Sequence, residues 1–107
     1  MAPMRKVHAL VGLAAALSGC VTYAFTPTTR QSAPAREAGC EFDLLSAAPR
    51  TPYVQLGFLE PTVQAHSAVE FYDAVRGELC AAGGDAVLTE INGLGEYVRG
   101  TVIAYVE

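Results

Sequence analysis

The chain has 107 residues and a formal net charge of −4, and 51% of its residues are hydrophobic. This length is enough for one small domain. The only lysine is Lys6, and the arginines are scattered along the chain. Because no basic cluster is present to neutralise phosphates, the composition argues against nucleic-acid binding and against attraction to anionic lipid head groups.

The first nineteen residues have the pattern of an export signal. Arg5 and Lys6 form a cationic head, and an apolar run follows from Val7 to Leu17. That run is shorter than the roughly 20 apolar residues that span a bilayer, but it suits the h-region of a signal peptide. We therefore predict that residues 1–19 are removed on export. All eleven acidic residues follow this segment, so the mature chain is more acidic than the whole.

The signal ends in Leu17-Ser18-Gly19-Cys20, which resembles the lipobox of bacterial lipoproteins. The resemblance implies that Cys20 becomes the first mature residue and carries fatty acyl chains such as palmitate. Two or three acyl chains hold a protein firmly on a membrane, whereas one binds only marginally. Val21 in place of Asp after the cysteine implies sorting to the outer membrane, facing the periplasm. An ordinary secretory signal with a chance cysteine is the alternative.

Residues 20–39 are predicted to form the lipidated cysteine and a flexible tether. Residues 21–39 are rich in Pro, Thr, Ser and Ala and show no helical or strand periodicity. This composition is typical of linkers, and nineteen such residues would have a root-mean-square reach of about 25 Å. The folded domain is accordingly expected to span residues 40–107.

Cys40 and Cys80 are the two cysteines that remain once Cys20 carries lipid. An even number of cysteines in a small exported domain favours a disulfide, which would add about 4 kcal/mol of stability in the chain-entropy model. Free thiols or an intermolecular bridge are the alternatives. The spacing of Cys and His does not match a structural metal site, so no metal or other cofactor is expected.

Two short strands are predicted to open the domain. Apolar and polar residues alternate over Glu41–Leu45 and again over Tyr53–Leu59, which is the periodicity of half-buried strands. Glu60-Pro61 should end the second strand. The residues expected on its core face are Val54, Leu56 and Phe58.

A helix is predicted from about Val63 to Ala82, with Gly83-Gly84 as its left-handed ending. Apolar residues recur there at intervals of three or four, so they share one side of the helix. This predicted stripe consists of Ala65, Ala68, Tyr72, Val75 and Leu79.

Two further strands, Ala86–Ile91 and Tyr97–Val106, are predicted around a hairpin turn at Asn92–Gly95, because Asn and Gly tolerate positive φ. The order is thus β-β-α-β-β, an α+β domain with one helix on a four-stranded sheet. The last strand has one face of small residues, suited to close packing of the helix. Its other face would be a docking patch if nothing covers it, and that face contains Tyr97, Ile103 and Tyr105. Coverage by the tether or by a second copy is the alternative.

Short motifs in this domain resemble the Rcs stress-sensor lipoprotein family. They are Tyr53–Gly57, Asp85–Leu88 after the helix, and Gly100 in the last strand, and the resemblance covers residues 53–105. It implies a similar small α+β fold, as does a likeness in outline to YbjQ-like domains. The sensor family has four cysteines that form two bridges in its folded domain, whereas the domain of this chain has two cysteines.

No catalytic site is predicted. His66 is the single histidine beyond the export signal, and Gly-x-Ser-x-Gly does not occur. Glu41 and Asp43 share a strand face and could bind a cation, but an exposed acidic surface explains them more simply. The preferred interpretation is a non-enzymatic interaction or sensor module that binds another envelope protein. The alternative is a small-ligand or metal-binding envelope domain that uses His66 or the acidic strand face.

Overall fold

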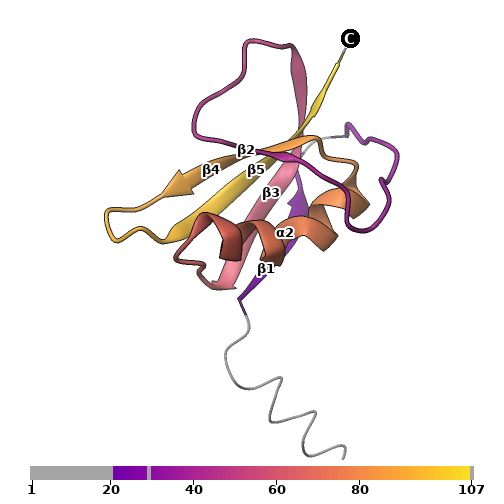
Figure 1. Cartoon of the computed structure of the whole chain (residues 1–107). Helices are drawn as coiled ribbons and strands as arrows, with labels where there is room; N and C mark the ends of the chain where they lie inside the picture. The colour runs from indigo at the N-terminus through magenta and orange to yellow at the C-terminus, as the bar shows by residue number, and fades with distance from the viewer. Residues whose placement is uncertain (1–20, 29, 107) are drawn as a thin grey trace, which may run out of the picture.

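The computed structural model describes residues 21–28 and 30–106, which form an α+β fold with one helix packed on a mixed five-stranded sheet (Figure 1). The strand order is β1-β3-β5-β4-β2, and every pairing is antiparallel except that of β2 with β4. The predicted fold class is therefore confirmed, with one strand more than expected. The elements are β1 (Thr22–Pro27), β2 (Asp43–Leu45), β3 (Tyr53–Val63), α2 (Ala68–Ala82), β4 (Ala86–Ile91) and β5 (Tyr97–Tyr105).

The additional strand, β1, lies inside the predicted tether. It pairs antiparallel with β3, from Thr22 opposite Val63 to Pro27 opposite Gly57. Its ring at Tyr23 is buried against the helix, and Phe25 packs on the same core. The tether prediction is wrong here because the alternation of these two aromatic residues was hidden among Pro, Thr and Ala. The folded domain thus begins at Thr22 and not at residue 40.

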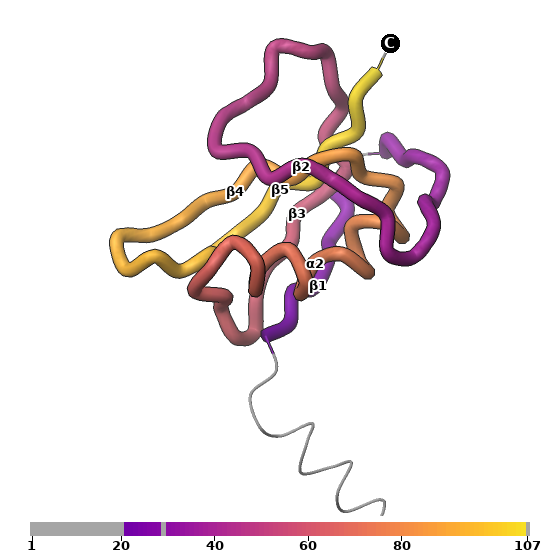
Figure 2. The backbone as a smooth tube through the Cα atoms, viewed as in Figure 1, coloured from indigo at the N-terminus to yellow at the C-terminus, as the bar shows by residue number. Residues whose placement is uncertain are grey.

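The segment after β1 also packs on the domain. It passes the C-terminal end of α2, as the tube in Figure 2 shows, and Arg36 N donates a hydrogen bond of 2.7 Å to Cys80 O. A Cβ added at Gly83 would lie 2.5 Å from Pro34 O, so the two backbones approach closely. Gly83 ends the helix with a φ of 82°, which is the left-handed cap predicted.

A bulge in β3 changes which side chains enter the core. Gln55 pairs with Ile103, but the next pair is Gly57 with Val102, so Leu56 is the extra residue. Beyond the bulge the alternation reverses: Leu59 is fully buried and Phe58 faces the other side of the sheet. The prediction that Phe58 faces the core is therefore wrong.

β3 also continues through Pro61 to Val63, contrary to the predicted ending at Glu60-Pro61. Pro61 pairs with Tyr23 of β1, whereas the pairing with β5 stops earlier, at Leu59 with Gly100. The missing N–H of proline therefore interrupts no bond to β5. The presence of β1, which the sequence did not reveal, is what extends the strand.

The helix begins later than predicted, at Ala68 in place of Val63. Ser67 is its N-cap, because the Ser67 hydroxyl accepts a hydrogen bond of 3.1 Å from Glu70 N, and the Glu70 carboxylate accepts one of 2.7 Å from His66 N. Ala65 lies before the helix, in a bridge to Tyr97. The buried side of the helix consists of Phe71, Val75, Leu79 and Cys80.

Phe71 is the centre of the core. Its ring meets Tyr23 edge-on at a centroid distance of 5.0 Å and stacks on Tyr97 at 4.9 Å. Gly100 of β5 lies beneath it, where a Cβ would come within 3.2 Å of Phe71 Cζ and 2.7 Å of Val87 Cγ2. The predicted close packing of the helix on small residues of β5 is confirmed at this position.

The sheet has two distinct ends along its strands. At one end β1 and β5 begin, β3 and β4 finish, and the N-terminus of α2 lies close by; we call this the hairpin end, after the turn Asn92–Gly95 (Figure 1). At the other end lie the C-terminus of α2 and a disulfide, and we call it the disulfide end. The predicted turn is confirmed: Asn92 Oδ1 accepts hydrogen bonds from Leu94 N and Glu96 N.

Candidate functional site

The two cysteines of the domain form a disulfide at the disulfide end. Cys40 lies in the loop before β2 and Cys80 in the last turn of α2, with their Cα atoms 5.9 Å apart. Both residues are buried in the core. The predicted intramolecular bridge is confirmed. It joins Cys40, at the predicted boundary between tether and domain, to α2.

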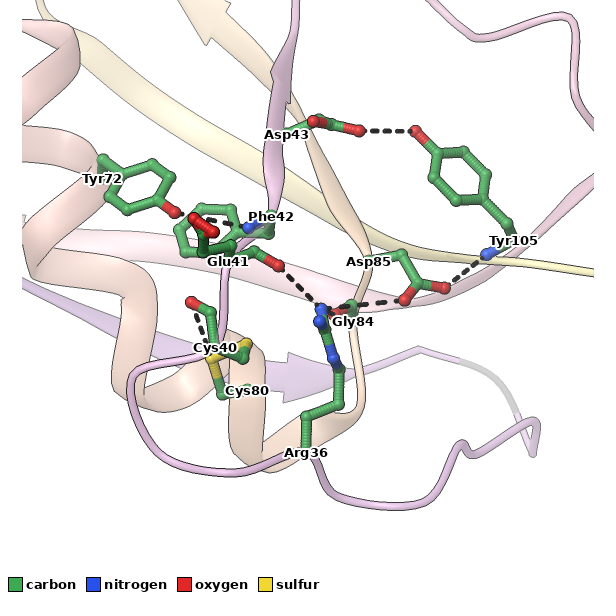
Figure 3. A network of polar contacts seen from close by, with 10 residues as sticks. All are labelled: Arg36, Cys40, Glu41, Phe42, Asp43, Tyr72, Cys80, Gly84, Asp85 and Tyr105. Carbon is green, nitrogen blue, oxygen red and sulfur yellow. Dashed lines mark hydrogen bonds and ion pairs between the residues drawn. A yellow bond between two sulfur atoms is a disulfide. The ribbon is translucent and has the colours of Figure 1, made fainter.

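Arg36 reinforces the same end (Figure 3). Its Nη1 donates hydrogen bonds to Gly84 O at 2.8 Å and to Glu41 O at 3.0 Å, and lies 3.7 Å from Asp85 Oδ1. The other oxygen of Asp85 accepts a hydrogen bond of 2.9 Å from Tyr105 N. Sequence reasoning missed this role because Arg36 stood in a segment without periodicity. The arrangement holds three segments of the chain together through one nitrogen of the guanidinium.

The acidic strand face is also engaged. Asp43 accepts a hydrogen bond of 3.3 Å from the Tyr105 hydroxyl (Figure 3). Burial raises the pKa of Tyr105 above its usual value, and the negative charge of Asp43 raises it further. Glu41 is exposed, with only its backbone carbonyl in the network. In the described part of the chain no three His, Cys, Asp or Glu residues lie close enough together to hold a metal ion.

His66 is placed at the hairpin end. Its Nε2 lies 3.2 Å from Glu96 Oε2, and Glu96 also accepts a hydrogen bond of 2.8 Å from Asn92 Nδ2. These contacts join the start of α2 to the turn between β4 and β5. The histidine that was considered as a metal ligand therefore has a carboxylate partner that connects two elements of the fold.

The predicted docking patch of Tyr97, Ile103 and Tyr105 is wrong as a single surface. Ile103, on the central strand β5 between β3 and β4, is 0% exposed. Tyr97 faces the helix and stacks on Phe71. The cause is a bulge at Val98, which reverses the alternation of β5 at its first residues. Of the three, only Tyr105 keeps an outward, half-buried position near Asp43.

The sheet face opposite α2 has a different centre. The guanidinium carbon of Arg99 lies 3.5 Å from the centroid of the Phe58 ring, and Thr101 pairs with Phe58 beside it. Arg99 Nε is 3.8 Å from Glu90 Oε2 and has no hydrogen-bond partner. We call this surface the open face, because α2, the helix of the described chain, covers the other side of the sheet (Figure 1). The open face consists of Phe58, Glu90, Arg99 and Thr101.

Exposed aliphatic side chains gather at the hairpin end. Val63 is 43% exposed, Val69 73%, Ile91 49% and Leu94 81%. Val106, at the disulfide end, is the remaining exposed large hydrophobic residue among those described. A shallow apolar hollow of about 200 Å³ adjoins Val69, and its lining consists of Leu44, Ala68, Val69 and Tyr72. Sequence reasoning missed this surface because its residues come from separate elements, and Val63 was predicted to lie in the helix.

Comparison with known proteins identified no relative of this chain. No family model, no curated protein and no solved structure matches the chain. Over the residues that the structure describes, no helix has the length and apolarity needed to cross a membrane. The predicted signal of residues 1–19 and the predicted lipidation of Cys20 lie outside those residues.

Proposed function

We propose that this protein is a bacterial envelope lipoprotein. In this proposal Cys20 carries the lipid that holds the domain on the outer membrane, facing the periplasm. The observation that carries the proposal is the succession of a cationic head, an apolar run and Leu17-Ser18-Gly19-Cys20. Two or three acyl chains supply enough buried methylene groups for stable attachment without a spanning helix.

If Cys20 carries the lipid, the position of β1 would hold the domain close to the membrane surface and not at the end of a long flexible tether. Val21 is the one residue between Cys20 and β1, which begins at Thr22. Two residues of fully extended chain span about 7 Å. The acylated residue would therefore lie within about 7 Å of the start of the sheet, in place of the reach of about 25 Å that a nineteen-residue tether would allow.

We further propose that the domain acts without catalysis, as an interaction or sensor module. Two of the three polar side chains that sequence reasoning considered for chemistry have partners inside the protein, His66 with Glu96 and Asp43 with Tyr105, and the third, Glu41, is exposed. The open face supports an interaction role, since it presents an aromatic ring and an arginine, both partly exposed, on the side of the sheet opposite α2. Aromatic residues and arginine contribute most to many protein interfaces.

The alternative, binding of a small ligand, is supported by one observation. The apolar hollow beside Val69 has about 200 Å³ and could take a small apolar group. The metal-binding form of this alternative has less support, because His66 and Asp43 already contact protein side chains.

The lipid assignment is tested by growing the expressing bacterium with an alkyne-bearing palmitate analogue. The wild-type chain should take up the label, and Cys20→Ser should lose both the label and membrane attachment. Mass spectrometry of the mature N-terminus identifies the lipid directly. Retention of the label, or of membrane attachment, by Cys20→Ser would overturn the assignment.

The interaction role is tested with a photocrosslinking amino acid placed at Phe58 or, as a control, at Val106. A single envelope protein captured from Phe58 and not from Val106, and lost with Arg99→Glu, is the expected result. Equal capture from both positions would contradict an interaction through the open face.

A further inference from the structure

We infer that the hairpin end rests on the bilayer, with four aliphatic side chains in its interface as a second membrane contact beside the lipid. This inference depends on the proposed lipidation of Cys20. The side chains, which we call the aliphatic rim, are those of Val63, Val69, Ile91 and Leu94.

The strand register places the rim at the end where the lipid would be attached. Val63 pairs with Thr22, the first residue of β1. Ile91 is the last residue of β4, which lies two strands away from β3 in the sheet. Leu94 follows in the turn. With strands about 4.8 Å apart, the row from β1 to β4 is only about 14 Å wide.

The N-terminus of α2 is fastened to the same end. The contact of His66 Nε2 with Glu96 Oε2 joins it to the turn, and Tyr97 N donates a hydrogen bond of 2.9 Å to Ala65 O. Val69 lies in the first turn of α2, so it belongs to this same end of the molecule. The rim therefore belongs to one rigid end built from β3, β4, the turn and α2.

Covalent geometry brings this end to the membrane. With at most about 7 Å of chain between Cys20 and Thr22, the start of β1 cannot move far from the lipid. The opposite end lies about 30 Å away, because β5 runs the length of the sheet in nine residues at about 3.3 Å each. Of the two ends, the one that must stay near the bilayer is the one that exposes four of the five exposed large hydrophobic side chains of the described residues.

The chemistry of the rim suits the interface between head groups and acyl chains. Leu94 and Val69 are 81% and 73% exposed, and covering such surface is favourable by about 25 cal/mol per Å². Three carboxylates at this end contact protein groups: Glu70 accepts from His66 N, Glu96 lies beside His66 and Asn92, and Glu90 Oε2 lies 3.8 Å from Arg99 Nε. Glu60, on β3, is exposed to solvent. With no basic cluster present, the contact is apolar and should not depend on anionic lipid or salt.

The chain contains no tryptophan, so a single introduced tryptophan reports its own surroundings without background. The test uses full-length Leu94→Trp, purified with its lipid and reconstituted in phosphatidylethanolamine vesicles. Val106→Trp, exposed at the disulfide end, is the matched control, and Val69→Trp is a second rim variant. Lipids brominated along their acyl chains quench tryptophan that reaches the hydrocarbon boundary.

We expect a blue-shifted emission and loss of intensity with brominated lipid for Leu94→Trp and Val69→Trp, unchanged by salt. Val106→Trp should keep the emission of exposed tryptophan and resist quenching. Mass spectrometry of the same samples separates the two proposals: an unlipidated Cys20 refutes the anchor, whereas a lipidated protein with unquenched rim tryptophans refutes the rim contact alone. A blue shift without lipid quenching would assign the rim to a second copy of the chain and likewise overturn the inference.

Discussion

The two ends of the sheet are held together by different means. At the disulfide end, the bond of Cys40 with Cys80 and the hydrogen bonds of Arg36 join segments that are distant in sequence. At the hairpin end, one buried hydroxyl on Tyr23, a capped helix and a short turn do this work, and the outermost side chains are aliphatic and exposed. Because cross-links stabilise the disulfide end, the hairpin end can leave apolar side chains uncovered without loss of the fold.

Loss of the disulfide should have the largest effect on stability. The bridge closes a loop with a sequence separation of 40, and removing such a constraint costs about 4 kcal/mol. We expect Cys40→Ala with Cys80→Ala to lower the free energy of unfolding by this amount, measured by urea titration. The wild-type protein with a reducing agent is the control and should behave alike. An unchanged urea midpoint would mean that the disulfide does not stabilise its end of the sheet.

Removal of the Tyr23 hydroxyl should have the next largest effect and tests the hairpin end. This hydroxyl accepts a hydrogen bond of 2.9 Å from the buried Ala65 N and donates one to Tyr97 O. Tyr23→Phe leaves that N–H unsatisfied, which costs about 1–3 kcal/mol. Tyr105→Phe is the matched control, because its hydroxyl contacts an exposed carboxylate, and it should cost much less. Equal losses in the two variants would remove the distinction between a buried and an exposed hydroxyl.

Alkaline pH should weaken the fold through the same two tyrosines, by a smaller amount. Burial, with the nearby negative charge of Glu70, raises the pKa of Tyr23 in spite of the opposing hydrogen bond from Ala65, and burial beside Asp43 raises that of Tyr105. A group whose pKa is higher in the folded state contributes stability that is complete below its unfolded pKa and is lost as the pH rises through its folded pKa. The free energy of unfolding should therefore fall above about pH 10.

The pH dependence can be assigned to its source by comparing variants. Tyr23→Phe should flatten the decline above about pH 10 more than Tyr105→Phe does, because Tyr23 is the more deeply buried. Urea midpoints measured from pH 8 to pH 11 provide the comparison. A decline that persists unchanged in the double variant would point to a different titrating group.

Features that depend on residues close together in the sequence were predicted more accurately than features that depend on distant ones. β4, the Asn92 turn and the Gly83 cap were predictable, since each depends on residues within a few positions. The α+β class and the disulfide pairing also followed from composition and pattern. The cap and the turn form from local chemistry, whereas the disulfide joins residues 40 apart and was predictable only because two cysteines remained to pair.

The rest depends on partners far along the chain. β1 is a strand because β3 offers it an edge, and the bulges at Leu56 and Val98 arise from the register between strands. Each bulge moved an aromatic residue to the opposite face, so the predicted docking patch was lost and the Phe58–Arg99 pair took its place. The aliphatic rim was not predicted for the same reason, since its four residues come from separate elements.

Substitution of Leu94 should have the smallest effect on stability, and it sharpens the comparison of the two ends most directly. The side chain is 81% exposed at the turn, so Leu94→Gln should change the free energy of unfolding by no more than about 0.5 kcal/mol. Urea titration of the unlipidated chain measures this, with Val106→Gln as a control of similar small effect. A loss of several kcal/mol would mean that Leu94 is a core residue, and the rim would then be a packing feature. A negligible loss, together with quenching of Leu94→Trp by brominated lipid, would mean that this leucine is dispensable for folding and is used at the membrane.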